Sequence, residues 1–189
     1  YGLVGSEMCI RDRISLSPAE PELGDTVTIT IQVKNQGQAG AASSQVTCYV
    51  DAAIIGTNSI DALGPGLMTT TSFQWTAELG THTIRALSDS AGLVSESDEN
   101  NNELTYQLTT LAPDLVIESI SWSPSAPSVG EPVTFTVRIS NIGNALAQTT
   151  TLDFYIDSSS RGVHDIPRIE PGESITDTYS WVSQTGQHS

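Results

Sequence analysis

The chain has 189 residues, in which 7 Lys and Arg stand against 22 Asp and Glu, giving a formal net charge of −15. This excess of acids argues against nucleic acid and against an anionic membrane surface as partners, because few cations are available for phosphates or anionic headgroups. The sequence also shows no hydrophobic span for membrane insertion. The length fits one or two domains. The acidic, Ser- and Thr-rich composition fits a surface or secreted module, a binder of divalent cations, or a high-salt habitat.

The first 13 residues form a doubtful leader. Tyr1–Arg13 resembles read-through of sequencing-adaptor sequence, and the alternative is a native linker or the end of a preceding domain. We therefore leave residues 1–13 out of the functional reasoning.

Period-two alternation of apolar and polar residues dominates the chain after the leader. It is most regular in Val27–Gly37, VTITIQVKNQG, and indicates a strand with one buried and one solvent-facing side. The stretch ends in Asn35 and Gly37, residues that tolerate positive φ and so end a strand in a turn. Similar patterns predict seven strands, namely Ile14–Leu16, Thr26–Lys34, Gln45–Asp51, Ile54–Ile60, Thr69–Thr76, Thr81–Ser88 and Glu103–Thr109. No stretch is helical, so the fold class is all-β, an immunoglobulin-like or fibronectin-like antiparallel sandwich.

Two features describe the predicted core. Cys48 alternates with Val46 and Val50, so we expect it to point inward as a small hydrophobe, without an intersheet disulfide. Trp75 shares a strand face with Phe73, which favours core packing over a sugar-binding platform. By the same logic Trp122, the equivalent of Leu16, is interpreted as a core or interdomain residue.

The whole pattern occurs twice. Val133–Gly143, VTFTVRISNIG, repeats the regular stretch 106 positions later, and the same offset pairs many Gly, Pro, Trp and His residues without a gap. We infer tandem sandwiches at residues 14–112 and 113–189. Since Ser189 matches Thr83, the second copy should lack its last two strands. We expect its core face to be partly uncovered, unstable alone and prone to edge pairing.

These motifs support a family resemblance. PDLVIESISWSPSAPSVGEPVTFTVRISNIGNA has a Pro-Asp-Leu opening, Pro-x-x-x-Gly before the central strand, and Asn-x-Gly after it. It resembles the start of a CARDB module, a cell-adhesion-related domain of bacteria and archaea. The acidic Val94–Glu103 is similar to the Glu- and Asn-rich end of such repeats. The resemblance implies modules of extracellular or cell-surface proteins, in tandem or beside secreted enzymes.

The same acidic region suggests a calcium site. The proposed ligands are Asp89, Glu96, Asp98, Glu99 and Asn101, which offer the hard oxygens that Ca²⁺ prefers. The spacing does not match an EF-hand. The alternative is a turn around Ser90–Gly92, stabilised by side-chain-to-backbone hydrogen bonds.

No catalytic motif stands out. G-x-S-x-G, H-E-x-x-H, zinc-type Cys/His spacing and Gly-rich phosphate loops are missing from the sequence. Asp51 and Asp157 follow equivalent strands, where turn initiation is favoured over cation binding. His82 and His188 are interpreted as structural, and His164 is predicted to be exposed in a loop.

These observations predict a non-enzymatic adhesion or spacer segment of a larger prokaryotic surface or secreted protein, with a protein or surface glycan as partner. The alternative is a carbohydrate-binding accessory module of a secreted hydrolase. Exposed aromatic residues aligned on one sheet face would favour this alternative, whereas buried Trp75 and Trp181 would favour the spacer.

Overall fold

The computed structural model describes residues 8–9 and 13–189, so most of the leader hypothesis lies outside the described residues. The chain divides into two compact units, Tyr1–Leu111 and Ala112–Ser189, which we call the first and second modules. The described residues form strands and no helix, which confirms the all-β prediction.

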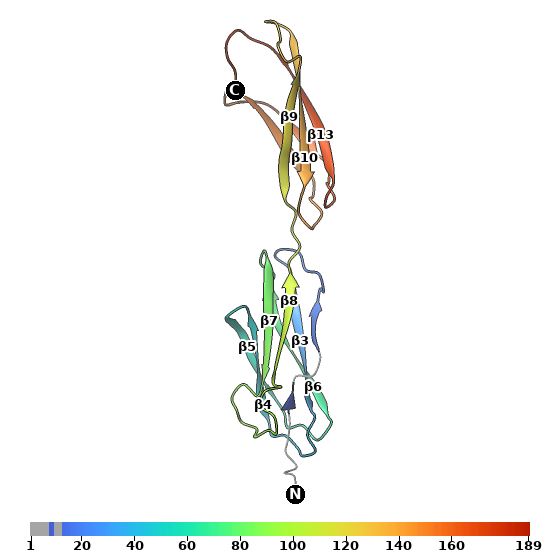
Figure 1. Ribbon diagram of the computed structural model, residues 1–189, viewed down its shortest axis with the longest axis vertical. Helices are drawn as coiled ribbons and strands as arrows, with labels where there is room; N and C mark the ends of the chain where they lie inside the picture. The colour runs from blue at the N-terminus through green and yellow to red at the C-terminus, as the bar shows by residue number, and fades with distance from the viewer. Residues whose placement is uncertain (1–7, 10–12) are drawn as a thin grey trace. The chain divides into compact units, whose positions relative to one another are not determined.

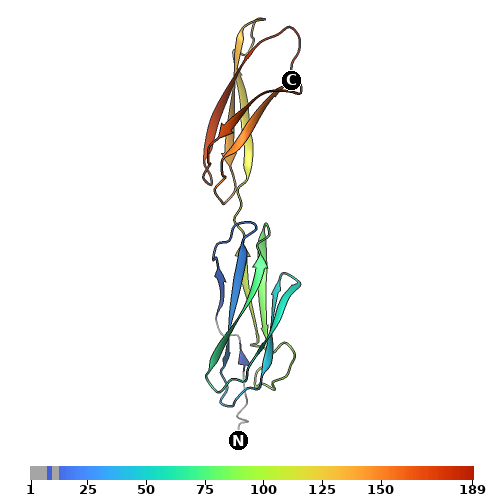
Figure 2. The same ribbon diagram turned by 180° about the vertical axis from the view of Figure 1, so that it is seen from behind.

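The first module is a sandwich of two antiparallel sheets (Figure 1; Figure 2 from behind). In one sheet, β3 pairs with β1, β2 and β6, and the other sheet has the order β5-β4-β7-β8. The seven predicted strands are all present, with small shifts at their ends. The bounds are β1 (Met8–Cys9), β2 (Ile14–Ser17), β3 (Thr26–Asn35), β4 (Ser44–Val50), β5 (Ala53–Ile60), β6 (Met68–Thr76), β7 (Thr81–Ser88) and β8 (Glu103–Thr109).

The core lies between these two sheets. Val27, Ile29, Ile31 and Val33 of β3 are fully buried, as the alternation predicts, while the residues between them lie on the other face. Cys48 of β4 is also fully buried, and desolvation raises the pKa of its thiol to about 12. A thiol with such a pKa is an unreactive core residue at neutral pH.

The Asn-x-Gly motif ends β3 by a mechanism that differs from the predicted one. Neither Asn35 nor Gly37 has a positive φ. Instead, fully buried Asn35 joins two loops: its Nδ2 donates to the carbonyls of Ala39 and Leu63, both at 2.8 Å, and its Oδ1 accepts from Gly37 N at 3.0 Å. The prediction of a positive φ was wrong because a side-chain amide, rather than backbone freedom, makes the turn.

The second module repeats this arrangement. Asn141 Nδ2 donates to the carbonyls of Ala145 and Ile169, at 2.8 and 2.9 Å. Its glycine has a further role, because a Cβ at Gly143 would clash with the backbone of Pro113 and Asp114. Glycine therefore permits a close approach of two backbone segments here.

The second module contains the equivalents of β1 to β6, and β9 pairs with β10 at the places where both β1 and β2 pair with β3. One sheet has the order β13-β10-β9 and the other consists of β11 and β12. The bounds are β9 (Leu115–Ser123), β10 (Pro132–Asn141), β11 (Thr150–Ile156), β12 (Ser159–Ile166) and β13 (Ser174–Val182). Among the described strands of this module, none pairs with the second edge of β11, the edge that β7 occupies on β4 in the first module.

Apolar residues of the second module are exposed on the side where β7 and β8 cover the first module. Ile120 and Trp122 of β9 are 59% and 54% exposed, and Tyr155 of β11 is 60% exposed. They line an apolar groove of about 400 Å³ that extends down to Phe135 and Tyr179. The core face is thus open, in agreement with the expectation from the repeat register.

Candidate functional site

The acidic loop connects β7 to β8, and Asp89 is its most buried acid. Asp89 is only 7% exposed and has a φ of 43°. Its two carboxylate oxygens accept from Leu93 N at 2.9 Å and Val94 N at 3.0 Å, while its carbonyl accepts from Gly92 N at 2.8 Å. This is the side-chain-to-backbone turn that was the alternative to a calcium ligand.

The other acids of the loop also bond locally. Glu99 accepts from Glu96 N at 3.0 Å, and Asp98 accepts from Asn100 N at 2.9 Å. Asn102 Nδ2 donates to Glu96. These side chains therefore hold the loop through hydrogen bonds within it.

Two further observations bear on the calcium hypothesis. Asn102 is 5% exposed, and its Oδ1 has no hydrogen-bond partner. In the described part of the chain, no three His, Cys, Asp or Glu side chains are grouped so that they could hold a metal. That survey does not cover amide or backbone oxygens, which Ca²⁺ also takes. Calcium binding by Asp89, Glu96, Asp98, Glu99 and Asn101 stays a prediction.

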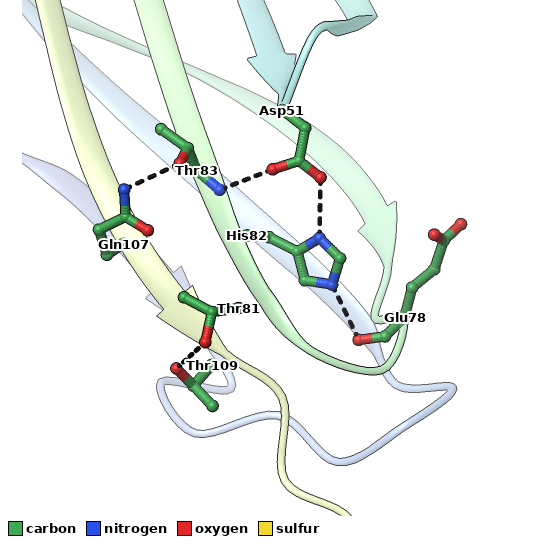
Figure 3. A network of polar contacts seen from close by, with 7 residues as sticks. All are labelled: Asp51, Glu78, Thr81, His82, Thr83, Gln107 and Thr109. Carbon is green, nitrogen blue, oxygen red and sulfur yellow. Dashed lines mark hydrogen bonds and ion pairs between the residues drawn. The ribbon is translucent and has the colours of Figure 1, made fainter.

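A histidine–aspartate contact closes one end of the first module, and we call it the clasp (Figure 3). Asp51 lies between β4 and β5 with a φ of 54° and reaches the start of β7. Its Oδ2 lies 2.9 Å from His82 Nδ1, and its Oδ1 accepts from Thr83 N at 2.9 Å. His82 Nε2 lies 3.1 Å from the carbonyl of Glu78, and the ring packs edge-on against Trp75.

The hydrogen bonds of the clasp favour the protonated form of His82 and the ionised form of Asp51. The carboxylate and the carbonyl can only accept, so both ring nitrogens of His82 donate when the ring is protonated. The hydrogen bond to Asp51 raises the pKa of His82, and the same bond, together with that from Thr83, lowers the pKa of Asp51. Because both ring nitrogens are engaged and the ring is buried, His82 is a structural residue, as interpreted from sequence, and Asp51 has its predicted place in a turn.

The second module contains the same clasp. Asp157 has a φ of 52°, lies 2.6 Å from His188 Nδ1, and accepts from Ser189 N at 3.0 Å. Trp181 packs edge-on against His188. The bond to His188 lowers the pKa of Asp157. One difference is that Nε2 of His188 is buried without a hydrogen-bond partner.

The prediction for His164 was wrong. It lies in β12, half-buried against Phe154 and Tyr179, and its Nδ1 is 2.6 Å from Asp177 Oδ2 on β13. Sequence reasoning missed Asp177 because the first module has a different pair at these positions. The signal lay in the repeat register, which aligns the His164–Asp177 pair with Asn58 and Thr71, and these two also bond, at 2.8 Å.

The aromatic residues fall into two groups. Phe73 is buried and Trp75 packs against the same core, as expected for structural residues. Trp122, interpreted from sequence as a core or interdomain residue, instead lies exposed on the open face of the second module.

Comparison with known families identifies the modules. The CARDB family model matches residues 7–106 and 112–189, which correspond closely to the two modules. The chain belongs to the CARDB family. This confirms the resemblance seen in the sequence, and CARDB is a non-catalytic domain family.

Similar solved structures include a CARDB domain. A CARDB domain from Pyrococcus furiosus, in complex with di-metal ions, is 25% identical with a TM-score of 0.51, over 57% of this chain and 90% of that chain. A domain of a "putative cell surface protein" from Methanosarcina acetivorans is 27% identical with a TM-score of 0.45, over 56% and 92%. No match is found among curated proteins. In the described residues, no helix is long and apolar enough to cross a membrane.

Proposed function

We propose that the two CARDB modules form a non-enzymatic adhesion or spacer segment of a larger extracellular or cell-surface protein of a prokaryote. The observation that carries this proposal is that the repeated polar side chains make their contacts inside each module. In both modules, the repeated His, Asp and Asn side chains hold strands and loops together. Side chains engaged in this way stiffen a module, and the exposed loops remain for contact with a partner.

The clasp has the geometry that a mechanical element needs. Asp51 bonds simultaneously to the side chain of His82 and to the backbone of Thr83, so it joins the β4–β5 turn to the start of β7. A charge-assisted pair of this kind is stronger than a neutral hydrogen bond. It fixes the start of β7, which pairs with the end of β8, where a tensile load on a tandem array would enter the module.

Force spectroscopy on the full chain, pulled from its two ends, tests the spacer role. We expect one well-defined rupture for the closed first module, and a lower rupture force in Asp51→Ala. The matched Asp157→Ala, which alters the clasp of the second module, should leave that rupture unchanged. Extension of the wild-type first module without a distinct rupture would contradict a mechanical role.

The second element of the proposal is calcium bound at the acidic loop. Three observations support it: the unpartnered Oδ1 of buried Asn102, the carboxylates of Glu96, Asp98 and Glu99 in the same loop, and the di-metal complex of the Pyrococcus furiosus relative. Calcium there would stiffen the β7–β8 connection. It would also neutralise part of the net charge of −15.

A thermal melt of the full chain in EDTA and then in millimolar Ca²⁺ tests this site. A cation that binds only the folded state adds about 2.7 kcal/mol at a hundredfold excess over Kd. The double variant Glu96→Gln and Asp98→Asn should lose the shift, whereas Glu118→Gln, in the second module, should keep it. An unchanged melting temperature in the wild type would leave a metal-free spacer.

Exposed aromatic residues support the alternative of a carbohydrate-binding accessory module. Trp122 and Tyr155 both line the open groove of the second module. Pull-down of the full chain with insoluble polysaccharides tests this alternative. Binding that Trp122→Ala abolishes would favour it, and the same wild-type chain remaining in the supernatant would favour the spacer.

A further inference from the structure

Two buried polar oxygens lie at the root of the acidic loop in the first module. Ser88, the last residue of β7, and Asn102, which precedes β8, are 1% and 5% exposed. Among the described residues, neither Ser88 Oγ nor Asn102 Oδ1 has a hydrogen-bond partner. Because an unpaired polar atom in the interior is destabilising, two such atoms on neighbouring strands point to a ligand that they share.

The two side chains lie on the same face of the sheet. Ser88 N donates to the carbonyl of Asn102 at 2.8 Å, and this bond continues the antiparallel register of β7 and β8. Residues directly opposite each other in such a register have side chains on one face, with Cβ atoms about 4.5–5.5 Å apart. Ser88 continues the buried alternation of Ile84 and Ala86, so this face is the one toward the core. A ligand shared by the two oxygens would therefore join the loop ends of β7 and β8 from the inner side.

A carboxylate completes this group. Asn102 Nδ2 donates to Glu96, so the amide that carries the unpaired oxygen is in contact with an acid of the loop. Glu96 is half-buried, whereas Asp98 and Glu99 are exposed. Asp89 is engaged differently, since both of its carboxylate oxygens accept from backbone amides of the turn. The loop contains no Lys or Arg, and the negative charge of Glu96 therefore favours a cation over a water molecule beside the two oxygens.

We propose that Ser88 Oγ, Asn102 Oδ1 and the carboxylate of Glu96 are the side-chain ligands of a calcium ion at the root of the loop. This inference rests on the calcium site proposed above and assigns its ligands and its selectivity. Backbone carbonyls and water would complete the set of about six to eight oxygens that Ca²⁺ takes. Mg²⁺ suits such a set poorly, because it requires near-octahedral geometry at shorter distances and loses its water reluctantly. The bound ion would hold β7 to β8 where the acidic loop leaves the sheet.

Isothermal titration calorimetry of the full chain with CaCl2, and separately with MgCl2, tests this assignment. We expect the wild type to bind Mg²⁺ about tenfold or more weakly than Ca²⁺. Ser88→Ala and Asn102→Ala should each weaken calcium binding by about tenfold or more, since even groups outside the ligand shell contribute about 10- to 100-fold to metal affinity. Asn102→Asp keeps an oxygen ligand and adds a charge, so it should bind calcium at least as tightly as the wild type.

Thr110→Val is the matched control. Thr110 is 2% exposed and its Oγ1 also has no partner within the described structure, but it follows the opposite end of β8, so its loss should leave calcium binding unchanged. In EDTA, Ser88→Ala should not lower the melting temperature, because it removes an unpaired hydroxyl from the interior. A loss of calcium binding in this variant is then separate from a loss of folding.

The outcomes separate this inference from the calcium site itself. Wild-type calcium affinity in both Ser88→Ala and Asn102→Ala would overturn the assignment and leave calcium at the exposed acids. Equal binding of Mg²⁺ and Ca²⁺ would overturn it as well, and so would Asn102→Asp binding as weakly as Asn102→Ala. A wild-type chain that binds no calcium would overturn the proposed calcium site and this inference with it.

Discussion

The two modules contain nearly the same strands, but only the first has a β7–β8 pair that covers its core face. We call this covering closure. β3 and β10 have equivalent bounds, as have β6 and β13, and the turns with positive φ lie at equivalent positions. Yet Ile14 and Ile120, the same residue type at equivalent positions, differ from 8% to 59% in exposure. The difference shows that the β7–β8 pair, rather than the sequence of the strand itself, buries this position.

Closure does not affect the loops that follow the central strands. Asn35 and Asn141 are both fully buried, and each donates to two loop carbonyls at 2.8 to 2.9 Å. The Asn network is therefore local to one end of each sheet. The two modules should respond alike to mutations in this network and differently to mutations under the cover.

The largest effect is expected for Asn35→Ala. The substitution leaves the carbonyls of Ala39 and Leu63 without their donor, and a buried unsatisfied group costs about 1–3 kcal/mol. We expect a loss of about 3 kcal/mol in the free energy of unfolding of the first module. Urea denaturation followed by hydrogen exchange assigns the loss to a module. Asn141→Ala should destabilise the second module similarly, and a loss below about 1 kcal/mol in both would contradict the network.

The second prediction compares the same substitution at a buried position of the first module and at the equivalent exposed position of the second. Ile14→Ala removes a buried side chain and should cost about 2–3 kcal/mol. Ile120→Ala, at the equivalent exposed position, should stay within about 0.5 kcal/mol. The same urea titration measures both. Equal losses would mean that the second module is covered in solution.

Sequence reasoning predicted the strands, the repeat and the open core because all three depend on local periodicity and register. It predicted the burial of Val27 and Cys48 for the same reason. It was wrong about Gly37 and His164, whose conformation or exposure depends on partners that lie far away in the chain. No local pattern marks Asp177 as the partner of His164 or Leu63 as the acceptor for Asn35. Such contacts follow from the packing of the two sheets.

A third prediction concerns the pH dependence of the clasp in the first module. His82 has a pKa raised above 6.5 and Asp51 a pKa lowered below 3.8. The raised pKa adds stability that is full below pH 6.5 and is lost as the pH rises through the folded value. The lowered pKa adds stability that is full above pH 3.8 and is lost on acidification. Thermal melts should therefore show maximal stability of the first module between these limits.

The control for this pH dependence is His82→Gln, which keeps a donor but cannot be protonated. Its melting temperature should no longer fall as the pH rises above 6.5. Glu78 is the other acid whose charge acts on His82, so Glu78→Gln should shift the pH of the fall only slightly. An alkaline fall that is the same in wild type and His82→Gln would assign the effect to other groups.

The smallest effect comes from the cation over Tyr49. Arg85 stacks on this ring and also bonds to Glu103 at 3.1 Å, and both charged groups are partly exposed. A cation–π contact at an exposed site contributes about 0.5–1 kcal/mol. Arg85→Gln should therefore lower the stability of the first module by about that amount in urea titrations. Tyr155→Leu should leave the second module nearly unchanged, because no cation lies over its ring in the described structure. If Tyr155→Leu costs as much as Arg85→Gln, the ring of Tyr155 is already covered in solution, and the difference in closure between the modules is smaller than their exposures indicate.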